Sequence, residues 1–172
     1  RRCDMLKARV MPCLLLAGGS LVKTVRFNKQ VYIGDPINAV RIYNDMEVDE
    51  LIFLDITATA TKSEPQYKLI ESLAGECFMP LTYGGGVRTI EQMRRLFSIG
   101  VEKIAINTAI HEVPSLIEEA ACLFGNQAII ASIDSKRNIW GKNEVVIRNG
   151  HKHTGIKPEK LAIEVAKRGA GE

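Results

Sequence analysis

The residues best suited to chemistry in this chain follow short apolar runs. Asp55 lies at the end of the run "ELIFLDI", and Asp134 ends the run "AIIASID". A carboxylate at the end of a buried strand loses solvent, and this raises its pKa towards the range used in general acid–base catalysis. The two aspartates are therefore candidate catalytic groups, although either one can equally well hold a loop by accepting hydrogen bonds.

A glycine-rich stretch forms a candidate phosphate site. "TYGGGVRT" places Gly84, Gly85 and Gly86 after the apolar run "FMPLTY" and before a helix expected from about Thr89. Glycines allow backbone N–H groups to converge on an anion at the positive end of a helix. A plain flexible turn accounts for three glycines about equally well. Their position after a strand favours the anion site.

Three further polar residues can complete a pocket at the same end of the strands. Asn107 and Thr108 follow the run "EKIAIN" and offer neutral hydrogen bonds, or alternatively a helix cap. Lys23, in "LVKTVRF", can bring a cation over the mouth from the first loop, whereas a lone loop lysine is ordinarily a solvated surface charge. The Asp, Glu, His and Cys residues never cluster with ligand spacing, so we expect neither a metal ion nor a cofactor.

A second set of charged residues precedes the apolar runs. Arg9, Glu50 and Lys103 each stand just before a run, and Glu172 stands where a sixth run would begin. If all four side chains point inwards, two cations and two anions form a neutral ring. The simpler alternative is that strands begin at the wet surface, and the rarity of buried charges favours it.

These residues require a scaffold of repeated strand–helix units. The five apolar runs are "RVMPCLLL", "ELIFLDI", "FMPLTY", "EKIAIN" and "AIIASID", and their continuous apolarity is typical of a parallel sheet covered on both faces. Amphipathic segments between them carry helix signals, including Asp35 before Pro36, Thr89 as a cap, and a terminal Gly125. The pattern predicts an α/β fold, either an open doubly wound sheet or a closed barrel. The spacing of about 25 residues between the later runs favours a (β/α)8 TIM barrel, of which this chain covers about the first five units.

The chain is expected to form one domain over residues 1–172. Residues 139–150 are expected to form a β-hairpin inserted after the fifth strand, with Asn149 and Gly150 as turn residues. A complete barrel takes roughly 250 residues, so the chain is either part of a longer protein or a partial barrel whose open edges need a partner.

Composition excludes several functional classes. The 172 residues are 46% hydrophobic and carry a formal net charge of +3, with both signs interspersed, which does not indicate a nucleic-acid binder. No apolar run approaches the roughly 20 residues of a membrane span, and the start of the chain lacks the pattern of a signal peptide. The four cysteines are isolated, so we expect buried, reduced thiols and a cytoplasmic protein.

Several motifs together resemble the cyclase subunit, of HisF type, of imidazole glycerol phosphate synthase. They are "RVMPCL", "LVKTVRF", "GDPINAV", "DELIFLDITAT", "PLTYGGGVRT", "VEKIAINTA", "SIDSKR" and "RGAGE", which occur in order from about residue 5 to residue 172. The family is a (β/α)8 barrel that receives ammonia from a glutaminase partner docked on its lower face. It uses this ammonia on a substrate that carries two phosphates.

The resemblance implies a role for each candidate residue. Gly84, Gly85 and Gly86 would belong to a phosphate site, Asp134 would be one of two catalytic aspartates, and the substrate pocket would be lined by Lys23, Asp55, Asn107 and Thr108. The resemblance also implies that four charged residues form the gate through which ammonia enters, namely Arg9, Glu50, Lys103 and Glu172. This implication favours the inward-pointing ring over the surface positions that the rarity of buried charges alone had favoured.

One position departs from the family. The family's first strand reads Cys-Leu-Asp, and its aspartate is the second half of the acid–base pair, but Leu15 stands at the matching position here. Loss of a general acid or base costs about 10² to 10⁴ in rate. We therefore expect cyclisation to be impaired, while binding of a phosphorylated ligand and delivery of ammonia survive.

The departure directs the functional prediction. "PCLLL" followed by "LVKTVRF" is similar to a divergent branch of the family, found with surface-polysaccharide genes, whose barrel and glutaminase supply ammonia to amidate a sugar. The leading prediction is an ammonia-using synthase subunit that serves amidation of a surface-polysaccharide sugar. One alternative is the cyclase subunit of histidine biosynthesis. Another, from a different class, is a non-catalytic barrel that anchors and activates a glutaminase. The expected partners are a glutaminase and a phosphorylated small molecule.

Overall fold

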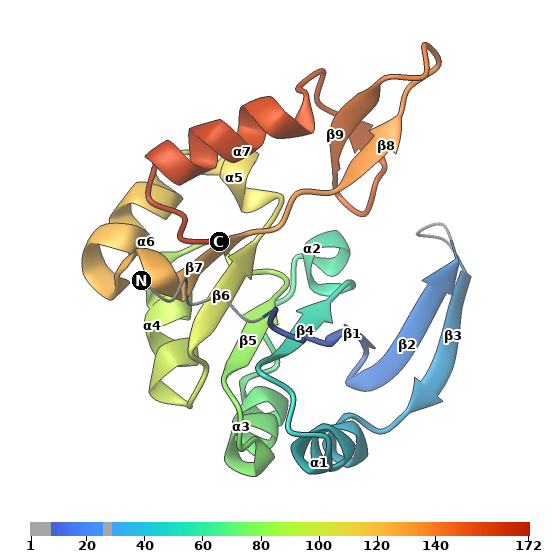
Figure 1. Ribbon diagram of the computed structural model, residues 1–172, viewed down its shortest axis with the longest axis vertical. Helices are drawn as coiled ribbons and strands as arrows, with labels where there is room; N and C mark the ends of the chain where they lie inside the picture. The colour runs from blue at the N-terminus through green and yellow to red at the C-terminus, as the bar shows by residue number, and fades with distance from the viewer. Residues whose placement is uncertain (1–7, 26–28) are drawn as a thin grey trace, which may run out of the picture.

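Residues 8–25 and 29–172 are described by the computed structural model, whose centre is a seven-stranded sheet (Figure 1). The strand order is β3-β2-β1-β4-β5-β6-β7. Five of these strands are parallel, in the order β1-β4-β5-β6-β7, and each contains part of one of the five apolar runs, so the predicted parallel sheet is confirmed. The strands are β1 (Cys13–Ala17), β2 (Ser20–Val25), β3 (Lys29–Gly34), β4 (Leu51–Asp55), β5 (Leu81–Gly84), β6 (Lys103–Ile106) and β7 (Ile129–Ala131).

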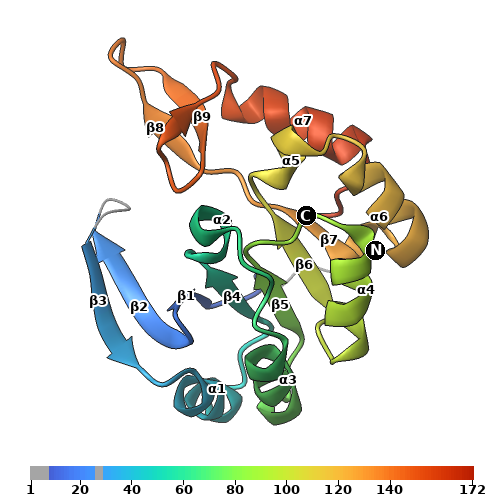
Figure 2. The same cartoon turned by 180° about the vertical axis from the view of Figure 1, so that it is seen from behind.

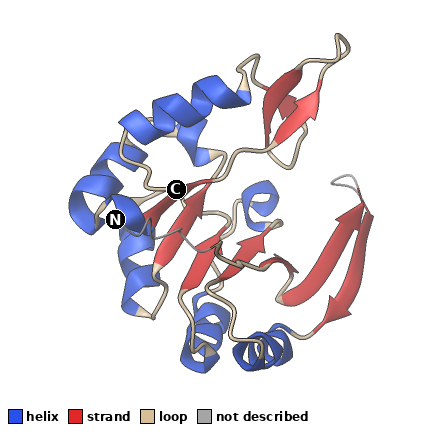
Figure 3. Cartoon of the chain, viewed as in Figure 1, coloured by secondary structure: helices blue, strands red, loops and turns tan. Residues whose placement is uncertain are grey.

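Helices cover the outer side of this curved sheet, as the colouring by secondary structure makes clear (Figure 3). The longer helices are α1 (Pro36–Asp45), α3 (Tyr67–Glu76), α4 (Ile90–Ser98), α6 (Leu116–Phe124) and α7 (Pro158–Lys167). Two single-turn helices, α2 (Ala58–Thr61) and α5 (Ala109–Glu112), follow β4 and β6, and a 3-10 turn spans Asn126–Ala128. No helix among the described residues is long and apolar enough to cross a membrane.

The helix ends are set by local sequence signals. The carboxylate of Asp35 accepts a hydrogen bond from the Asn38 N–H at 3.0 Å and caps α1, with Pro36 in the first helical position. Thr89 and Gln92 form a reciprocal capping box at the start of α4. Gly125, with φ of +88°, ends α6. The predicted caps at these three helices are confirmed.

Strand register divides the parallel sheet into two faces. Phe53, Tyr83, Ile104 and Ile129 lie side by side on β4 to β7, are at most 1% exposed, and belong to the core that the helices cover. Because side chains alternate along a strand, the next row points the other way. That row places Leu15 beside Leu54, then Gly84 and Ala105. It forms the inner face of the sheet, where the candidate site lies.

The structure corrects the expectation for the first loop. β2 (Ser20–Val25) and β3 (Lys29–Gly34) pair antiparallel, and β2 adds to the edge of β1. Gly18 and Gly19 both have positive φ, +58° and +84°, in the two-residue turn between β1 and β2. A Gly-Gly pair at such a turn is a hairpin signal. The sequence therefore contained a signal for this hairpin, and the interpretation that placed Lys23 on a loop overlooked it.

A small second sheet follows β7. It consists of β8 (Ser135–Arg137), β9 (Asn143–Ile147) and β10 (Lys152–His153) in the order β10-β9-β8, and it stands apart from the main sheet (Figure 2). The range 139–150 contains β9 and parts of its two flanking turns, and Asn149 and Gly150 lie in the turn before β10.

The expectation of buried thiols was wrong for two cysteines. Cys13 and Cys122 are exposed and Cys77 is half-buried, all three as free thiols, whereas Cys3 lies outside the described residues. Cys13 is the first residue of β1, and Cys122 lies on the outer helix α6, so neither is covered by the core.

Candidate active site

A cavity of about 190 Å³ lies on the inner face of the sheet, at the carboxyl ends of the parallel strands. It collects residues from β1, β4, β6 and the loops that follow β4, β5, β6 and β7, as expected for a site built where parallel strands end. Six residues predicted from the sequence line the cavity: Asp55, Gly85, Gly86, Asn107, Thr108 and Asp134. Leu15, the position that differs from the family motif, lines it as well.

Asp134 has the chemical environment of an acid–base group. Burial raises the pKa of its carboxyl group, and a hydrogen bond from the Asn107 amide at 3.3 Å opposes this rise without cancelling it. The same amide donates to the Ser132 carbonyl at 2.9 Å, which fixes the orientation of the Asn107 side chain. Asp134 therefore retains its proton to a higher pH than an ordinary aspartate, and it faces the cavity.

Asp55 is held differently, although it lines the same cavity. One of its oxygens accepts hydrogen bonds from the Thr57 N–H at 2.9 Å, the Thr57 hydroxyl at 2.7 Å and the Ala58 N–H at 3.1 Å. The other oxygen accepts from the Gln66 amide at 3.3 Å. These four donors organise the loop after β4. The loop-holding alternative considered for this aspartate is thus present in the structure, and Asp55 also lines the cavity.

The three glycines separate into two roles. Gly85 and Gly86 line the cavity with φ of +118° and +73°, whereas Gly84 is the buried last residue of β5 and does not line it. A Cβ atom on Gly84 would lie 2.7 Å from Leu54 Cδ2 and 2.9 Å from the Ala105 carbonyl oxygen. Gly84 is therefore required for packing between strands, and the candidate anion cradle consists of Gly85, Gly86 and the start of α4.

Asn107 and Thr108 sit beside this cradle on the neighbouring strand end. Thr108 occupies the N-cap position of α5, but its side chain makes no capping hydrogen bond. Its hydroxyl instead donates to the Asn107 side-chain oxygen at 3.3 Å and accepts from the Arg148 N–H at 3.3 Å. The pair is thus linked to Asp134 on one side and to the second sheet on the other.

Lys23 lies elsewhere than expected. It is an exposed residue on β2 and is absent from the cavity lining, while the adjacent Thr24 and its register partner Gln30 both line the cavity. Neighbouring residues on a strand point to opposite faces, so Lys23 points away from the side where Thr24 contributes.

Sequence reasoning missed two notable lining residues. Arg88 follows the glycines, and its guanidinium lies 3.4 Å from the Thr59 carbonyl oxygen at the cavity wall. Asn149 comes from the turn between β9 and β10, and its amide donates to the Ile56 carbonyl at 2.7 Å. "GGGVR" was a usable signal for a cation beside the cradle. No local pattern links Asn149 to Ile56, because 93 positions separate them.

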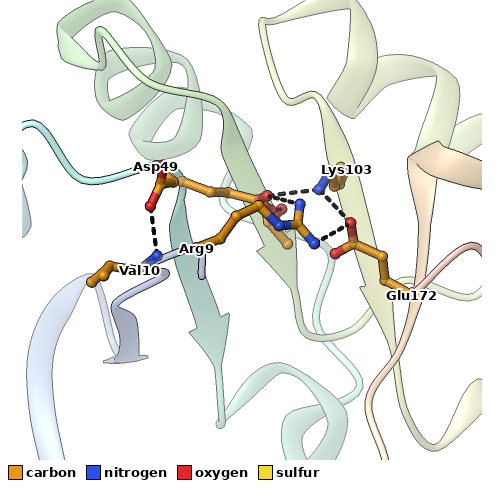
Figure 4. A network of polar contacts seen from close by, with 7 residues as sticks. Arg9, Val10, Asp49, Lys103 and Glu172 are labelled. Atoms are coloured by element: carbon orange, nitrogen blue, oxygen red, sulfur yellow. Dashed lines mark hydrogen bonds and ion pairs between the residues drawn. The ribbon is translucent and has the colours of Figure 1, made fainter. Parts of the chain in front are cut away.

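The four charged residues at the amino ends of the strands form a closed network (Figure 4). Lys103 Nζ lies 2.6 Å from Glu50 and 3.0 Å from Glu172, and Arg9 lies 2.8 Å from Glu172 and 3.9 Å from Glu50. The side chain of Glu50 is only 3% exposed, and it also accepts a hydrogen bond from the Thr82 hydroxyl. Cations and anions alternate around the ring, so its formal charge is zero.

The network shifts the titration of its members. Burial acts to lower the pKa of Lys103, but its hydrogen bonds with Glu50 and Glu172 outweigh burial and raise the pKa. Burial acts to raise the pKa of Glu172, and hydrogen bonds from Arg9 and Lys103 outweigh it and hold the pKa below the usual range. Both shifts favour the charged forms. The ring is therefore held together by ion pairs across the pH range in which proteins are ordinarily stable.

Comparison with known proteins identifies the family. The family model described as "Histidine biosynthesis protein" matches residues 9–172, which is nearly the whole chain. The chain belongs to the histidine biosynthesis protein family. This family is a (β/α)8 barrel, so the predicted fold class is confirmed, and the parallel strands described above are the first part of that barrel.

Relatives within the histidine biosynthesis family cover almost all of this chain. A protein of Pseudomonas aeruginosa, provisionally named imidazole glycerol phosphate synthase subunit hisF2, is 49% identical over 98% of the chain and 67% of its own length. A similarly named subunit HisF from Leptospira interrogans is 50% identical, with 98% and 66% covered. A Vibrio vulnificus protein, named as subunit hisF3, is 43% identical, with 98% and 65% covered. The chain thus spans about two thirds of the length of these relatives.

The close approach at Gly85 gives a first prediction. A Cβ atom there would lie 2.3 Å from the Asp55 carbonyl oxygen, at a φ that L residues rarely adopt. We expect Gly85→Ala to lower the free energy of unfolding by roughly 2–4 kcal/mol, measured by urea denaturation. Gly18→Ala is the matched control, because its φ is also positive but nothing lies within 4 Å of the added atom. Equal losses in the two variants would contradict the contact with Asp55.

The charged ring gives a second prediction, on pH dependence. Because the folded-state pKa of Glu172 is lowered, its charge stabilises the fold above the unfolded value near 4.5, and this contribution disappears as the pH falls through the folded value. We expect Glu172→Gln to destabilise the protein by about 1–2 kcal/mol at neutral pH. In urea denaturation at several pH values, the difference from the unsubstituted protein should shrink below pH 4.5.

The control for this experiment is Glu102→Gln, an exposed position next to Lys103 in sequence. It should have little effect at any pH. A Glu172→Gln difference that stayed constant down to acid pH would show that the ion pairs do not stabilise the fold.

Proposed function

We propose that this chain is part of an ammonia-using synthase subunit of a glutamine amidotransferase complex. Its substrate is a phosphorylated sugar or sugar nucleotide, and its pathway is amidation of a surface-polysaccharide sugar. The observation that carries this proposal is the composition of the cavity. Asp134 faces it with a raised pKa, and Leu15, at the position where the family resemblance places the second catalytic aspartate, lines the same cavity.

Phosphate recognition is supported by the cavity wall after β5. The positive-φ glycines Gly85 and Gly86 leave backbone atoms accessible to an anion, and Arg88 adds a cation to the same wall. Asn107 and Thr108 contribute neutral hydrogen-bonding groups. This combination suits the dianionic phosphate of a small molecule. Lys23 lies on β2 and does not line the cavity. It could contact the substrate only if the β2–β3 hairpin moved when substrate binds.

Asp134 has the properties needed for proton transfer during amidation. Ammonia must lose a proton when its nitrogen forms a bond to carbon, and the departing oxygen must gain one. In the protonated form that burial favours, the Asp134 carboxyl can donate to the departing oxygen, and the resulting carboxylate can then accept the proton from nitrogen. The Asn107 amide steadies the group through both states. One carboxyl group therefore suffices for a transfer in which the two proton steps follow one another.

Ammonia delivery is supported by the opposite end of the same strands. The ring of Arg9, Glu50, Lys103 and Glu172 lies at the amino ends, about 15 Å below the cavity along a five-residue strand. A ring with no net charge does not trap a neutral molecule, and Arg9, at 50% exposure, is its most mobile candidate for opening. We propose that a glutaminase docks over this end. The relatives are named as synthase subunits, which agrees with an assembly of several chains.

Exposed apolar side chains near the ring support a partner at this end. Val10 follows Arg9, Met46 follows α1, and Phe78 lies in the loop before β5, and these residues are 60%, 64% and 89% exposed. Exposed apolar residues grouped around one end of a fold mark interaction surfaces. The location of the complex in the cytoplasm stays a prediction.

A third prediction separates a catalytic barrel from a scaffold. In the full-length protein with its glutaminase, Asp134→Asn should reduce product formation by about 10² to 10⁴, because the amide cannot exchange a proton. Product should be followed with glutamine and, separately, with ammonium as the nitrogen source. Asp45→Asn on the exposed end of α1 is the matched control and should leave product formation unchanged. Full activity in Asp134→Asn would favour the non-catalytic barrel that anchors the glutaminase.

A fourth prediction addresses the histidine-pathway cyclase, which the names of the relatives favour and Leu15 opposes. We expect Leu15→Asp to raise cyclisation of the histidine-pathway intermediate, with ammonium as the nitrogen source, by about 10² or more. Leu54→Asp is the matched control, because Leu54 is the register partner of Leu15 on the same cavity floor. It adds the same charge one strand away and should not raise the rate.

The unsubstituted protein decides the outcome. If it cyclises the intermediate at a rate that Leu15→Asp does not improve, or if the intermediate stimulates glutamate release by the bound glutaminase, the polysaccharide proposal is contradicted. Circular dichroism of each variant verifies that the added carboxylate leaves the fold intact.

A further inference from the structure

The second sheet ends in a tip with two adjacent, large apolar side chains. Ile139 is 92% exposed and Trp140 is 78% exposed, and both lie in the turn between β8 and β9. This turn points away from the main sheet (Figures 1 and 2). At its other end, β9 is anchored to the cavity wall through Asn149. The apolar pair is therefore presented at the outermost part of a projecting element.

The tip is held in a defined shape. The Asn138 side-chain oxygen accepts hydrogen bonds from the N–H groups of Trp140 and Lys142, both at 3.0 Å. The Gly141 N–H donates to the Asn138 carbonyl at 2.9 Å, and the Asn138 N–H donates to the Lys142 carbonyl at 2.9 Å. Four hydrogen bonds in one turn leave little conformational freedom to lose on binding.

Positive charge is concentrated on the same element. Residues 135–157 contain six Lys or Arg side chains and a single acid, Glu144, whereas the whole chain has a net charge of only +3. The rest of the chain therefore carries a net negative charge. Glu144 is engaged by His153 at 3.5 Å and by the Gly155 N–H. Arg137 and Lys142, which flank the tip, are exposed and take part in none of the ion pairs of the described residues.

We propose that this tip docks reversibly on an anionic lipid bilayer. Tryptophan prefers the boundary between headgroups and hydrocarbon, and isoleucine prefers the hydrocarbon itself, so the pair is suited to shallow insertion. Arg137 and Lys142 then meet the negatively charged headgroups. Because the second sheet follows β7, it stands on the side where the cavity lies, and docking would bring the site close to the membrane surface. This inference rests on the tip alone and is independent of the reaction proposed above.

The unique tryptophan makes the test direct. Full-length protein is mixed with vesicles of phosphatidylcholine alone or of phosphatidylcholine with phosphatidylglycerol, and binding is measured by co-sedimentation and by fluorescence. These 172 residues contain one tryptophan, so its signal reports Trp140, and any tryptophan elsewhere in the full-length protein is replaced by phenylalanine first. We expect a blue shift on phosphatidylglycerol vesicles, at least about tenfold weaker binding to phosphatidylcholine alone, and weakening by added salt.

Variants assign the binding to the tip. Trp140→Ser should lower the partition onto phosphatidylglycerol vesicles about tenfold, and Lys142→Glu should lower it about fivefold or more. Leu123→Ser on α6, 56% exposed, and Lys68→Glu on α3 are the matched controls, and they should leave the partition unchanged.

The proposal is overturned if the full-length protein does not bind phosphatidylglycerol vesicles, or if Leu123→Ser weakens binding as much as Trp140→Ser. It is also overturned if the tip proves to be a protein contact. That outcome would be a change in oligomeric state, or loss of an acidic protein partner, caused by Trp140→Ser without vesicles present. Product formation in solution by Trp140→Ser tests the proposed reaction separately, because the tip lies outside the cavity lining.

Discussion

The parallel pairing of β1, β4, β5, β6 and β7 is the constraint on which the other features of this structure depend. Parallel strands have all their carboxyl ends on one side and all their amino ends on the other. The register then aligns Leu15, Leu54, Gly84 and Ala105 in one row on the inner face. Without a side chain on Gly84, Leu54 and Ala105 approach closely enough to close the floor of the cavity. Residues from segments far apart in the chain can therefore meet above that floor.

Charged side chains have different surroundings at the two ends of the parallel strands. At the amino ends, each charged side chain has partners of the opposite sign, so the loss of solvent around Glu50 is offset by ion pairs. At the carboxyl ends, Asp134 is partly buried and accepts a hydrogen bond from a neutral amide, so its proton is retained more readily. The ring charges are therefore paired, whereas Asp134 takes part in none of the ion pairs of the described residues.

Leu15 places an apolar side chain in the cavity at a position where the family resemblance leads one to expect a carboxylate. Its side chain lies in the cavity floor beside the apolar side chain of Leu54. A leucine cannot bind or release a proton, so this position cannot take part in proton transfer. Gly85, Gly86, Asn107 and Thr108 line the same cavity, and the charged ring lies at the opposite ends of the strands.

The sequence by itself determined the parallel strands, the helix caps and the motif that contains the cradle. These features depend on neighbouring residues: an apolar run forms a strand, Asp35 caps the helix that follows it, and a glycine turn follows β5. The ring residues were also identifiable, but their positions before strands left surface exposure as the better interpretation until the resemblance was considered.

Only the tertiary structure decided which glycines face the cavity, where Lys23 points and what covers the site. Gly84 and Gly85 are neighbours in sequence, yet the strand ends between them, so one packs against β4 and β6 and the other faces the cavity. Lys23 faces outward because β2 pairs with β1 and side chains alternate along it. Asn149 reaches Ile56 across 93 positions. Such contacts depend on strand register and on the packing of segments far apart in the chain. A short stretch of sequence does not specify either.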